Sequence, residues 1–354
     1  MMTVLLTGDT MMHPELFQEA IENTFGKDKF DLRIKKYTFN DAGFYLDSGT
    51  NIPSGMCLED PKIKMGYPDC GVNEYYGEPY SLAEDISDVE ILIIHGAALP
   101  RAVLEKAEKL KYIVSLRGGP ANIDMDYVKE RGINFYNTNG KNAPAVAEFA
   151  LGLLLDFERG ITYGASKLGE NWWWIKAADT YESHEIYGKK FGFVGYGRIA
   201  QEFRKRLSGF DIEAYAYSPH VDDELLERDN VKRLSLEELA ANCDYITLHT
   251  RPVKGKPPVI GEDILKLMQK HAVLINTGRG GLVDHKALKK ALEEKAIRGA
   301  VLDVLGDESF GFYQDLIAAE NTLITPHIAG QSVETCLRAC GMCVDILKKI
   351  MEEI

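Results

Sequence analysis

The sequence lacks the segments that would place a protein in a membrane or direct it to secretion. Among its 354 residues, no apolar run reaches the roughly 18 residues of a membrane span. Residues 1–9 have neither the basic flank nor the long apolar region of a signal peptide. These absences predict a cytoplasmic protein.

Positive charge is scarce as well. The chain has 41 Lys and Arg residues against 54 Asp and Glu residues, which gives a formal net charge of -13 at pH 7. Because such a field repels a nucleic-acid backbone and an anionic membrane surface, neither is expected as a partner. Hydrophobic residues make up 45% of the chain, as in an ordinary globular protein rather than a disordered one.

Cysteines are few, and the six present lack the spacing of a disulfide framework, so no disulfides are expected. Cys336, Cys340 and Cys343 spell C-x3-C-x2-C, which resembles a run of iron–sulfur ligands. The same positions share one face of a helix expected over residues 333–350. Apolar residues recur along that helix at similar spacing, namely Leu337, Val344, Ile346 and Leu347. We therefore expect the cysteines to pack in the core and no metal to be bound.

Strand-like apolar runs alternate with helical patterns along most of the chain, which is typical of β-α-β units and a parallel sheet. The first series has expected strands at residues 4–7, 32–36, 91–95, 112–116 and 133–136. Its expected helices cover residues 14–25, 100–110 and 123–131.

A long helix expected over residues 143–167 leads to the second series. The strands of that series are expected at residues 191–195, 212–217, 245–249, 273–276, 300–303 and 323–325. Six parallel strands in this pattern match the two mononucleotide-binding halves of a doubly wound, Rossmann-type sheet.

Two segments break the alternation. Residues 43–79 are rich in Gly, Pro and Tyr and have no regular period, which fits either a functional lid or a surface insertion. Trp172, Trp173 and Trp174 precede the second series. For these three side chains, packing between domains is favoured over a place beside the site.

A dinucleotide-binding pattern, G-x-G-x-x-A, runs from Gly195 to Ala200 between the first strand and the first helix of the second series. Gly195 is expected to make the tight turn, and Gly197 lacks the Cβ that would block a pyrophosphate. Backbone N–H groups near Arg198 and Ile199 would face the phosphate charge at the start of the helix.

The second strand of this series ends at Ser218, where the pattern usually has an acidic residue that binds the adenosine ribose. A serine can hydrogen-bond a ribose hydroxyl but carries no charge to exclude a 2′-phosphate, and no arginine immediately follows it. NAD(H) is the expected cofactor, and NADP(H) stays open. Further expected cofactor contacts follow other strands at Thr250, Thr277 and Gly330.

Polar side chains follow three later strands of the series. Arg279 follows the strand at 273–276, Asp303 closes the next strand and precedes Glu308, and His327 follows the last strand. Because the carboxyl ends of parallel strands share one edge, where ligands bind, we expect these side chains to gather there.

Several stretches closely resemble the D-isomer-specific 2-hydroxyacid dehydrogenases: residues 194–200 (V-G-Y-G-R-I-A), 275–281 (I-N-T-G-R-G-G), 302–304 (L-D-V) and 325–330 (T-P-H-I-A-G). Residues 117–124 (R-G-G-P-A-N-I-D) look like that family's glycine-rich substrate loop. The resemblance spans most of the chain. It implies an NAD(P)-dependent oxidoreductase that interconverts a D-2-hydroxy acid and its 2-keto acid, and a homodimer formed through the nucleotide domains.

By the same resemblance, Arg279 would bind the substrate carboxylate and carbonyl, His327 would be the acid/base, and Glu308 would be its carboxylate partner. Asp303 would face the nicotinamide carboxamide. The side chains suit these roles, because a guanidinium matches a carboxylate bidentately and a histidine can deliver a proton near neutral pH. Structural alternatives remain open: an ion pair between Arg279 and Asp284, a turn at His327, and a solvated Glu308.

The first series contributes the expected substrate contacts. In the loop that resembles the family's substrate loop, Gly118 and Gly119 would let a carboxylate approach backbone N–H groups. Arg117, His95 and Arg251 could add positive charge for an anionic tail on the substrate, although Arg117 could equally pair with a neighbouring carboxylate. The expected substrate is therefore a small molecule with a polar or phosphorylated group beyond its keto carbon, such as a sugar-derived acid.

The expected architecture is α/β with two domains. A Rossmann-type, doubly wound dinucleotide-binding domain would cover residues 141–325. A smaller, flavodoxin-like substrate-binding domain would be discontinuous, covering residues 1–140 and 326–354. The alternative to an enzyme is a nucleotide-sensing, corepressor-like protein of the same architecture, which would bind the nucleotide without turnover.

Overall fold

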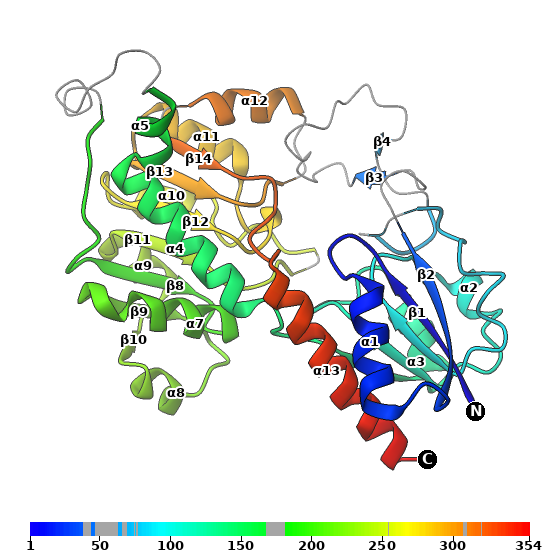
Figure 1. Ribbon diagram of the computed structural model, residues 1–354. Helices are drawn as coiled ribbons and strands as arrows, with labels where there is room; N and C mark the ends of the chain where they lie inside the picture. The colour runs from blue at the N-terminus through cyan, green and yellow to red at the C-terminus, as the bar shows by residue number, and fades with distance from the viewer. Residues whose placement is uncertain are drawn as a thin grey trace. The chain divides into compact units, whose positions relative to one another are not determined.

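A computed structural model describes residues 1–37, 44–46, 63–65, 69–73, 75, 77–167, 181–253, 255–306, 310–319 and 321–354. The chain divides into two compact units (Figure 1). Unit 1 comprises Met1–Ser48, Ser54–Asn142 and Gln331–Ile354, and unit 2 comprises Gly49–Pro53 and Ala143–Gly330. Two of these boundaries, after residues 142 and 330, lie a few residues later than the sequence suggested.

Unit 1 is built on a five-stranded parallel sheet with the order β2-β1-β5-β6-β7. Its strands are β1 (Met2–Gly8), β2 (Phe30–Lys36), β5 (Ile91–Ile94), β6 (Tyr112–Ser115) and β7 (Asn134–Asn137). In chain order this is the 2-1-3-4-5 arrangement of flavodoxin-like sheets, as expected.

A separate parallel pair, β3 (Phe44–Leu46) and β4 (Ile63–Met65), lies in the stretch 43–79, whose irregular sequence predicted no strand. Much of the remaining stretch lies outside the described residues, and so do Trp172, Trp173 and Trp174.

Helices cover both faces of the sheet in unit 1. The helices α1 (Pro14–Phe25) and α13 (Val333–Glu352) lie side by side against one face (Figure 1), where they pack on Val4 and Leu6. The shorter α2 (Arg101–Leu104) and α3 (Met125–Glu130) border the other core, which includes Leu5. Successive side chains of a strand point to opposite faces of the sheet, so Val4 and Leu6 of β1 face one core and Leu5 faces the other. Both faces of β1 are therefore apolar. The helix expected over 100–110 ends at Leu104, and turns follow it.

The three cysteines of α13 pack in the core, as their spacing predicts. Cys336, Cys340 and Cys343 are buried together with Leu347 in the cluster between α13 and the sheet. Leu337, whose spacing suggested a place on the same stripe, is instead 51% exposed. Leu337 follows Cys336 directly, so the turn of about 100° per residue carries its side chain away from the buried stripe.

Unit 2 is built on a seven-stranded parallel sheet with the order β10-β9-β8-β11-β12-β13-β14. Its strands are β8 (Lys190–Val194), β9 (Glu213–Tyr217), β10 (Val231–Arg233), β11 (Tyr245–Leu248), β12 (Val273–Asn276), β13 (Gly299–Leu302) and β14 (Thr322–Ile324). The direction of winding reverses between β8 and β11, which is where a doubly wound sheet binds its ligand. The sequence missed β10, because this edge strand has three residues and buries only Val231.

The first long helix of unit 2 is interrupted. The sequence predicted one helix over 143–167, but α4 (Ala143–Arg159) and α5 (Ile161–Lys167) are separated by Gly160. Gly160 has a φ of 59°, and a Cβ there would lie 2.7 Å from the ring of Tyr181. The left-handed conformation ends the helix, and glycine is the residue that adopts it without strain.

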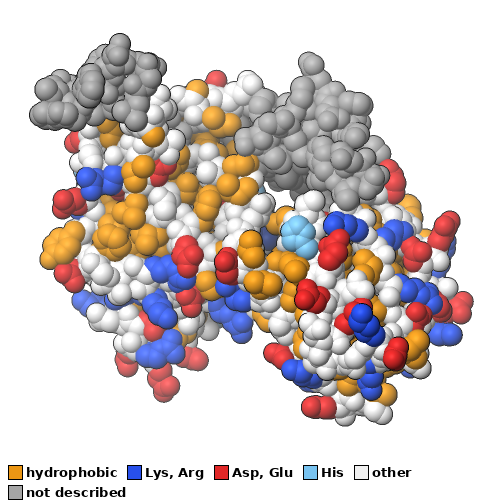
Figure 2. Space-filling model, in the orientation of Figure 1, with side chains coloured by type: hydrophobic (Ala, Val, Ile, Leu, Met, Phe, Trp, Pro, Cys, Tyr) orange, Lys and Arg blue, Asp and Glu red, His pale blue; other side chains and the backbone are white. Residues whose placement is uncertain are grey.

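The remaining helices of unit 2 are α7 (Arg198–Arg206), α8 (Asp223–Arg228), α9 (Leu236–Asn242), α10 (Glu262–Leu267), α11 (His285–Glu293) and α12 (Phe310–Ala318). Two short 3-10 helices cover Leu207–Phe210 and Gly280–Leu282. Acidic and basic side chains are interspersed over the face seen in Figure 2. In the part of the chain that the structure describes, no helix combines the length and the apolar character needed to cross a membrane.

Candidate active site

The turn between β8 and α7 forms the G-x-G-x-x-A segment of unit 2. Gly195 has a φ of 86°, and a Cβ there would lie 2.9 Å from the carbonyl group of His249, so glycine is required. Gly197 is the N-cap residue of α7, and a Cβ on it would meet no atom within 4 Å. Arg198 and Ile199 start the helix, where backbone N–H groups point out of the helix end. This arrangement fits a pyrophosphate.

Ser218 braces this turn from the end of β9. Its side chain is buried, and Oγ accepts a hydrogen bond of 3.2 Å from the backbone N–H of Tyr196. Arg233, at the end of β10, donates to the carbonyls of Ser218 (2.5 Å) and Val221 (2.6 Å) and forms an ion pair with Asp223. Arg233 was not expected here, because the short strand β10 that brings it to this loop was not predicted from the sequence.

Two threonines expected to contact the cofactor lie at the ends of β11 and β12. Thr250 packs beside the turn, since a Cβ on Gly195 would lie 3.0 Å from the Thr250 Cβ. Thr277 follows β12, and its Oγ1 is buried without a hydrogen-bond partner among the described residues. A buried hydroxyl of this kind costs free energy in the isolated protein, so a polar ligand atom that bonds to it would be stabilising.

Arg279 is an exposed residue on the loop after β12. Its Nη1 donates to the carbonyl of Gly278 at 2.9 Å. The fully buried Asn276 holds the loop, because its amide donates to the Arg279 carbonyl (2.9 Å) and accepts from the Gly278 N–H (3.0 Å). Asp284 does not pair with Arg279; its carboxylate caps α11 by accepting from two backbone N–H groups.

A close approach between two loops fixes the backbone beside Arg279. A Cβ on Gly280 would lie 1.7 Å from the carbonyl oxygen of Leu305 and 2.5 Å from the backbone nitrogen of Gly306. The loop after β13 therefore packs directly against the loop after β12. Only glycine leaves room for this contact.

Asp303, fully buried at the end of β13, organises the loop that carries His327. Its Oδ1 accepts from the Thr325 hydroxyl (2.6 Å) and the Ile328 N–H (3.0 Å), and its Oδ2 accepts from the Ala329 N–H (2.9 Å). His327 lies between these residues, is exposed, and has a φ of 58°, which non-glycine residues seldom adopt. The contact of Asp303 with a nicotinamide stays a prediction.

The remaining expected residues of unit 2 are less informative. Glu308 lies outside the described residues. Arg251 is exposed after β11, and Gly330 ends the turn that follows His327. Arg279, Asp303 and His327 thus follow three neighbouring strands at one edge of the sheet.

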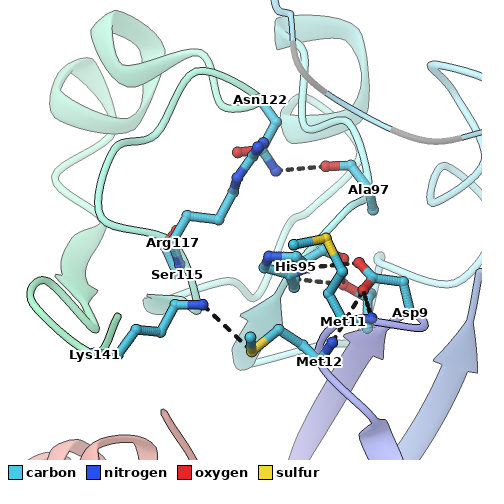
Figure 3. Close-up of polar contacts among 10 residues, drawn as sticks. Asp9, Met11, Met12, His95, Ala97, Ser115, Arg117, Asn122 and Lys141 are labelled. Carbon is cyan, nitrogen blue, oxygen red and sulfur yellow. Dashed lines mark hydrogen bonds and ion pairs between the residues drawn. The ribbon is translucent and has the colours of Figure 1, made fainter. Parts of the chain in front are cut away.

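In unit 1, His95 follows β5 and is buried against Asp9, which follows β1 (Figure 3). The distance from His95 Nδ1 to Asp9 Oδ2 is 2.5 Å, and Asp9 Oδ1 accepts from the N–H groups of Met11 (2.8 Å) and Met12 (3.1 Å). Burial would raise the pKa of Asp9, but the charge of His95 and these hydrogen bonds lower it overall. Burial lowers the pKa of His95, and Asp9 offsets this effect only in part. The ring N–H of His95 therefore donates to the Asp9 carboxylate.

The glycine-containing loop of unit 1 follows β6. Arg117, Gly118 and Gly119 are partly buried, and a Cβ on Gly119 would meet no atom within 4 Å. The buried Asn122 fastens the loop, because its amide donates to the carbonyl of Ala97 at 2.7 Å. Open space beside the backbone is what an approaching carboxylate requires.

Lys141, which the sequence analysis did not single out, is only 8% exposed after β7. Its Nζ donates to the Met12 thioether at 3.4 Å, and among the described residues no carboxylate forms an ion pair with it. Burial and the charge of Arg117 lower the pKa of Lys141 from 10.5 to about 8. Since one pKa unit corresponds to about 1.4 kcal/mol, keeping Lys141 protonated costs the folded protein about 3 kcal/mol of stability. This cost is present below pH 8 and is lost as the pH rises toward 10.5.

Three contributors to these strand ends were not found from the sequence. Asp9 could have been found, because it directly follows a strand just as Asp303 does. Lys141 lies several residues beyond its strand, so position after a strand did not select it. The contacts of Arg233 depend on the unexpected strand β10.

Comparison with known proteins places the chain in a family. The model of the D-isomer specific 2-hydroxyacid dehydrogenase NAD-binding domain matches residues 151–329. A hydroxypyruvate reductase of Thermotoga maritima is 31% identical over 84% of this chain and 95% of its own length. The chain belongs to the D-isomer specific 2-hydroxyacid dehydrogenases. A D-3-phosphoglycerate dehydrogenase of Methanocaldococcus jannaschii is 36% identical over 76% of this dehydrogenase, which spans 51% of that relative.

Solved structures support the fold of this dehydrogenase. A D-lactate dehydrogenase from Escherichia coli has a TM-score of 0.73 and 22% identity over 99% of this chain and 98% of its own. An acyclic imino acid reductase, solved with NADPH and D-Arg, has a TM-score of 0.75 and 22% identity over the same shares. At these identities the likeness shows the two-domain fold, as the sequence predicted, and leaves the substrate open.

Substituting Gly280 by Ala should destabilise the protein by at least about 2 kcal/mol, because the Leu305 backbone must move away. Gly281→Ala is the matched control, since a Cβ there would meet Pro252 at an ordinary 3.7 Å. Urea unfolding of both variants measures the difference. Equal midpoints for the two variants would contradict the close approach.

Proposed function

We propose that this dehydrogenase interconverts a D-2-hydroxy acid and its 2-keto acid with a nicotinamide cofactor. The observation that carries the proposal is the ordering of the strand ends in unit 2. The Asp303 carboxylate fixes the loop of His327, and the Gly280–Leu305 contact fixes the loop of Arg279. Family membership supports the same reaction class.

The bound nicotinamide supplies the hydride that reaches the keto carbon, or accepts it in the reverse direction. Arg279 binds the carboxylate of the acid and stabilises the negative charge that develops on the carbonyl oxygen. His327 gives a proton to that oxygen during reduction and removes it from the hydroxyl during oxidation. Glu308 is proposed to hold His327 in its protonated form, and Asp303 positions the His327 loop.

The cofactor would lie along the strand ends of unit 2. Gly195, Gly197 and the first N–H groups of α7, at Arg198 and Ile199, would hold the pyrophosphate. Support comes from the turn itself, where glycine is required at position 195 and no atom would obstruct a ligand at position 197. The buried hydroxyl of Thr277 is a further donor for a cofactor atom, and Thr250, Asp303 and Gly330 are the other proposed contacts.

We further propose that NAD(H) is preferred over NADP(H). The positive charge near Ser218 comes from Arg233, whose guanidinium is engaged by the carbonyls of Ser218 and Val221 and by Asp223. The Arg233 guanidinium would therefore bind a 2′-phosphate more weakly than an arginine without these partners.

The substrate is proposed to be a small 2-keto acid, with a sugar-derived or phosphorylated acid as the preferred class. The names of the relatives, hydroxypyruvate reductase and D-3-phosphoglycerate dehydrogenase, support this range of sizes and charges. Arg117, Gly118, Gly119 and His95 are the proposed contacts in unit 1.

Replacing His327 by Ala should reduce turnover of keto acids about 10²- to 10⁴-fold, because the proton needed by the developing oxyanion is lost. NADH affinity, measured by fluorescence titration, should change less than about twofold. His271→Ala is the control, since His271 is exposed and bound to Asp244 at the opposite end of β11 and β12. Near-native turnover in His327→Ala would remove this histidine from the mechanism.

Replacing Ser218 by Asp should increase the preference for NAD(H) over NADP(H) by about tenfold or more, because a carboxylate repels the 2′-phosphate. Asparagine has the shape of aspartate without its charge, so Ser218→Asn should leave the preference for NAD(H) unchanged. The ratio of kcat/KM for NADH and NADPH measures the effect. A parent enzyme that uses NADPH better than NADH would overturn the proposed preference.

We also propose a homodimer formed through unit 2. Hydrophobic side chains are exposed on the part of unit 2 where α4 lies (Figure 2). Phe149, Leu151 and Leu155 of α4 are only partly buried, and Ile161 and Tyr163 of α5 are exposed. An apolar patch of this kind is typical of a protein interface. Sedimentation at micromolar concentration should give the mass of two chains, and a monomer there would refute the proposal.

The corepressor-like alternative receives no support from the comparisons, whose reported relatives carry enzyme names. Tight nucleotide binding without oxidation of NADH by any keto acid would be its signature. A panel of keto acids separates the two functions.

A further inference from the structure

We propose that the strand ends of unit 1 bind a second anionic group of the substrate, with Lys141 as its principal ligand. The group is a carboxylate or a phosphate carried beyond the keto carbon. This inference rests on the proposed function, because it assigns the anion to the 2-keto acid. Arg279 already accounts for the carboxylate next to the reacting carbon, so the site in unit 1 serves an additional charge.

Lys141 is held where an ammonium group lacks good acceptors. Its three donor hydrogens are met among the described residues by the Met12 thioether, which is a weak acceptor. The backbone of Lys141 is fixed, since its N–H donates to the Thr138 carbonyl (3.3 Å) and its carbonyl accepts from Arg338 Nε of α13 (2.7 Å). A buried ammonium is favourable only when an anion or other strong acceptors surround it.

The neighbouring carboxylate is already engaged. Asp9 accepts hydrogen bonds from His95 and from the N–H groups of Met11 and Met12. Its charge favours the protonated form of Lys141, but no ion pair joins the two side chains. Lys141 therefore keeps its capacity to bind an oxyanion.

The charge of Arg117 acts on Lys141 from the neighbouring loop after β6. Burial and then the charge of Arg117 lower the pKa of Lys141, and Figure 3 shows the Arg117 side chain extending toward Asn122. Figure 3 shows the Lys141 side chain extending toward Met12, on the side where the His95 ring lies. A buried ammonium that a neighbouring cation repels is stabilised by an anion bound beside it.

A second, independent observation comes from the loop that carries Lys141. The Thr138 hydroxyl is completely buried and has no hydrogen-bond partner among the described residues. A hydroxyl can donate to an oxyanion, so a bound carboxylate or phosphate would supply the missing acceptor. Thr138 and Lys141 belong to the same turn after β7.

The charge of Lys141 makes the site sensitive to pH. Because its pKa is about 8 in the free protein, affinity for the second anion should fall about tenfold per unit above pH 8. The other charged or titratable groups facing Lys141 are Arg117, Asp9, His95 and the Cys336 thiol of α13. Cys336→Ala identifies the titrating group, because the profile should persist in that variant.

Kinetics with two classes of keto acid test the proposal. Glyoxylate and hydroxypyruvate carry one anionic group, whereas oxaloacetate and phosphohydroxypyruvate carry two. Lys141→Met should raise KM for the second class by about 10- to 100-fold, the value of a charge-assisted hydrogen bond, and change the first class less than about threefold. Lys111→Met is the control, because Lys111 is exposed, pairs with Glu90 and precedes β6.

A stability measurement tests the site without turnover or cofactor. Inorganic phosphate, compared with chloride at equal ionic strength, should raise the urea midpoint of the parent protein and leave that of Lys141→Met unchanged. Lys141→Met itself should unfold at a higher midpoint than the parent at pH 7, and this advantage should shrink above pH 8.

The outcomes separate the two proposals. If Lys141→Met raised KM equally for both classes of keto acid, Lys141 would serve the reacting end of the substrate, and the second anion site would be overturned. Equal stabilisation of parent and Lys141→Met by phosphate would also overturn it. If no keto acid is reduced by the parent, the proposed function fails, while dependence of the phosphate effect on Lys141 would still establish an anion site in unit 1.

Discussion

The parallel direction of the strands is the constraint on which both candidate sites depend. Every strand of a parallel sheet ends at the same edge, so residues far apart in the chain meet there without any further device. In unit 2 this edge collects Arg279, Asp303 and His327, and in unit 1 it collects Asp9 and His95. The sheets also require apolar strands on both faces, which confines polar chemistry to the strand ends.

Each unit uses a buried carboxylate to organise the loops at this edge. Asp303 accepts two backbone N–H groups and a hydroxyl from the segment that bears His327. Asp9 accepts two backbone N–H groups and the ring N–H of His95. An ionised carboxylate suits this task, because charge-assisted hydrogen bonds repay its removal from water and fix several loop positions at once. Its position therefore determines where a histidine lies.

Close approaches of backbone give the loops their final shape, whereas a few buried polar groups lack strong partners. Gly195 and Gly280 are required because carbonyl groups of neighbouring loops occupy the space of a side chain. Thr277 and Lys141, by contrast, hold polar groups in buried positions with no strong partner among the described residues. Free energy lost in such places would be recovered by a ligand that completed the hydrogen bonds.

The sequence by itself determined the α/β class, the two series of strands, the turn at Gly195 and the family, because these features depend on local period and on motifs with fixed spacing. It also pointed to Arg279 and His327, each of which lies three residues beyond a strand. Only the tertiary structure decided which strands are neighbours, that Gly160 interrupts a helix, and that Leu337 faces outward. It alone brought Lys141 to Met12 and Arg233 to Ser218. These contacts join loops from different strands, and pairing between distant segments leaves no periodic trace in the chain.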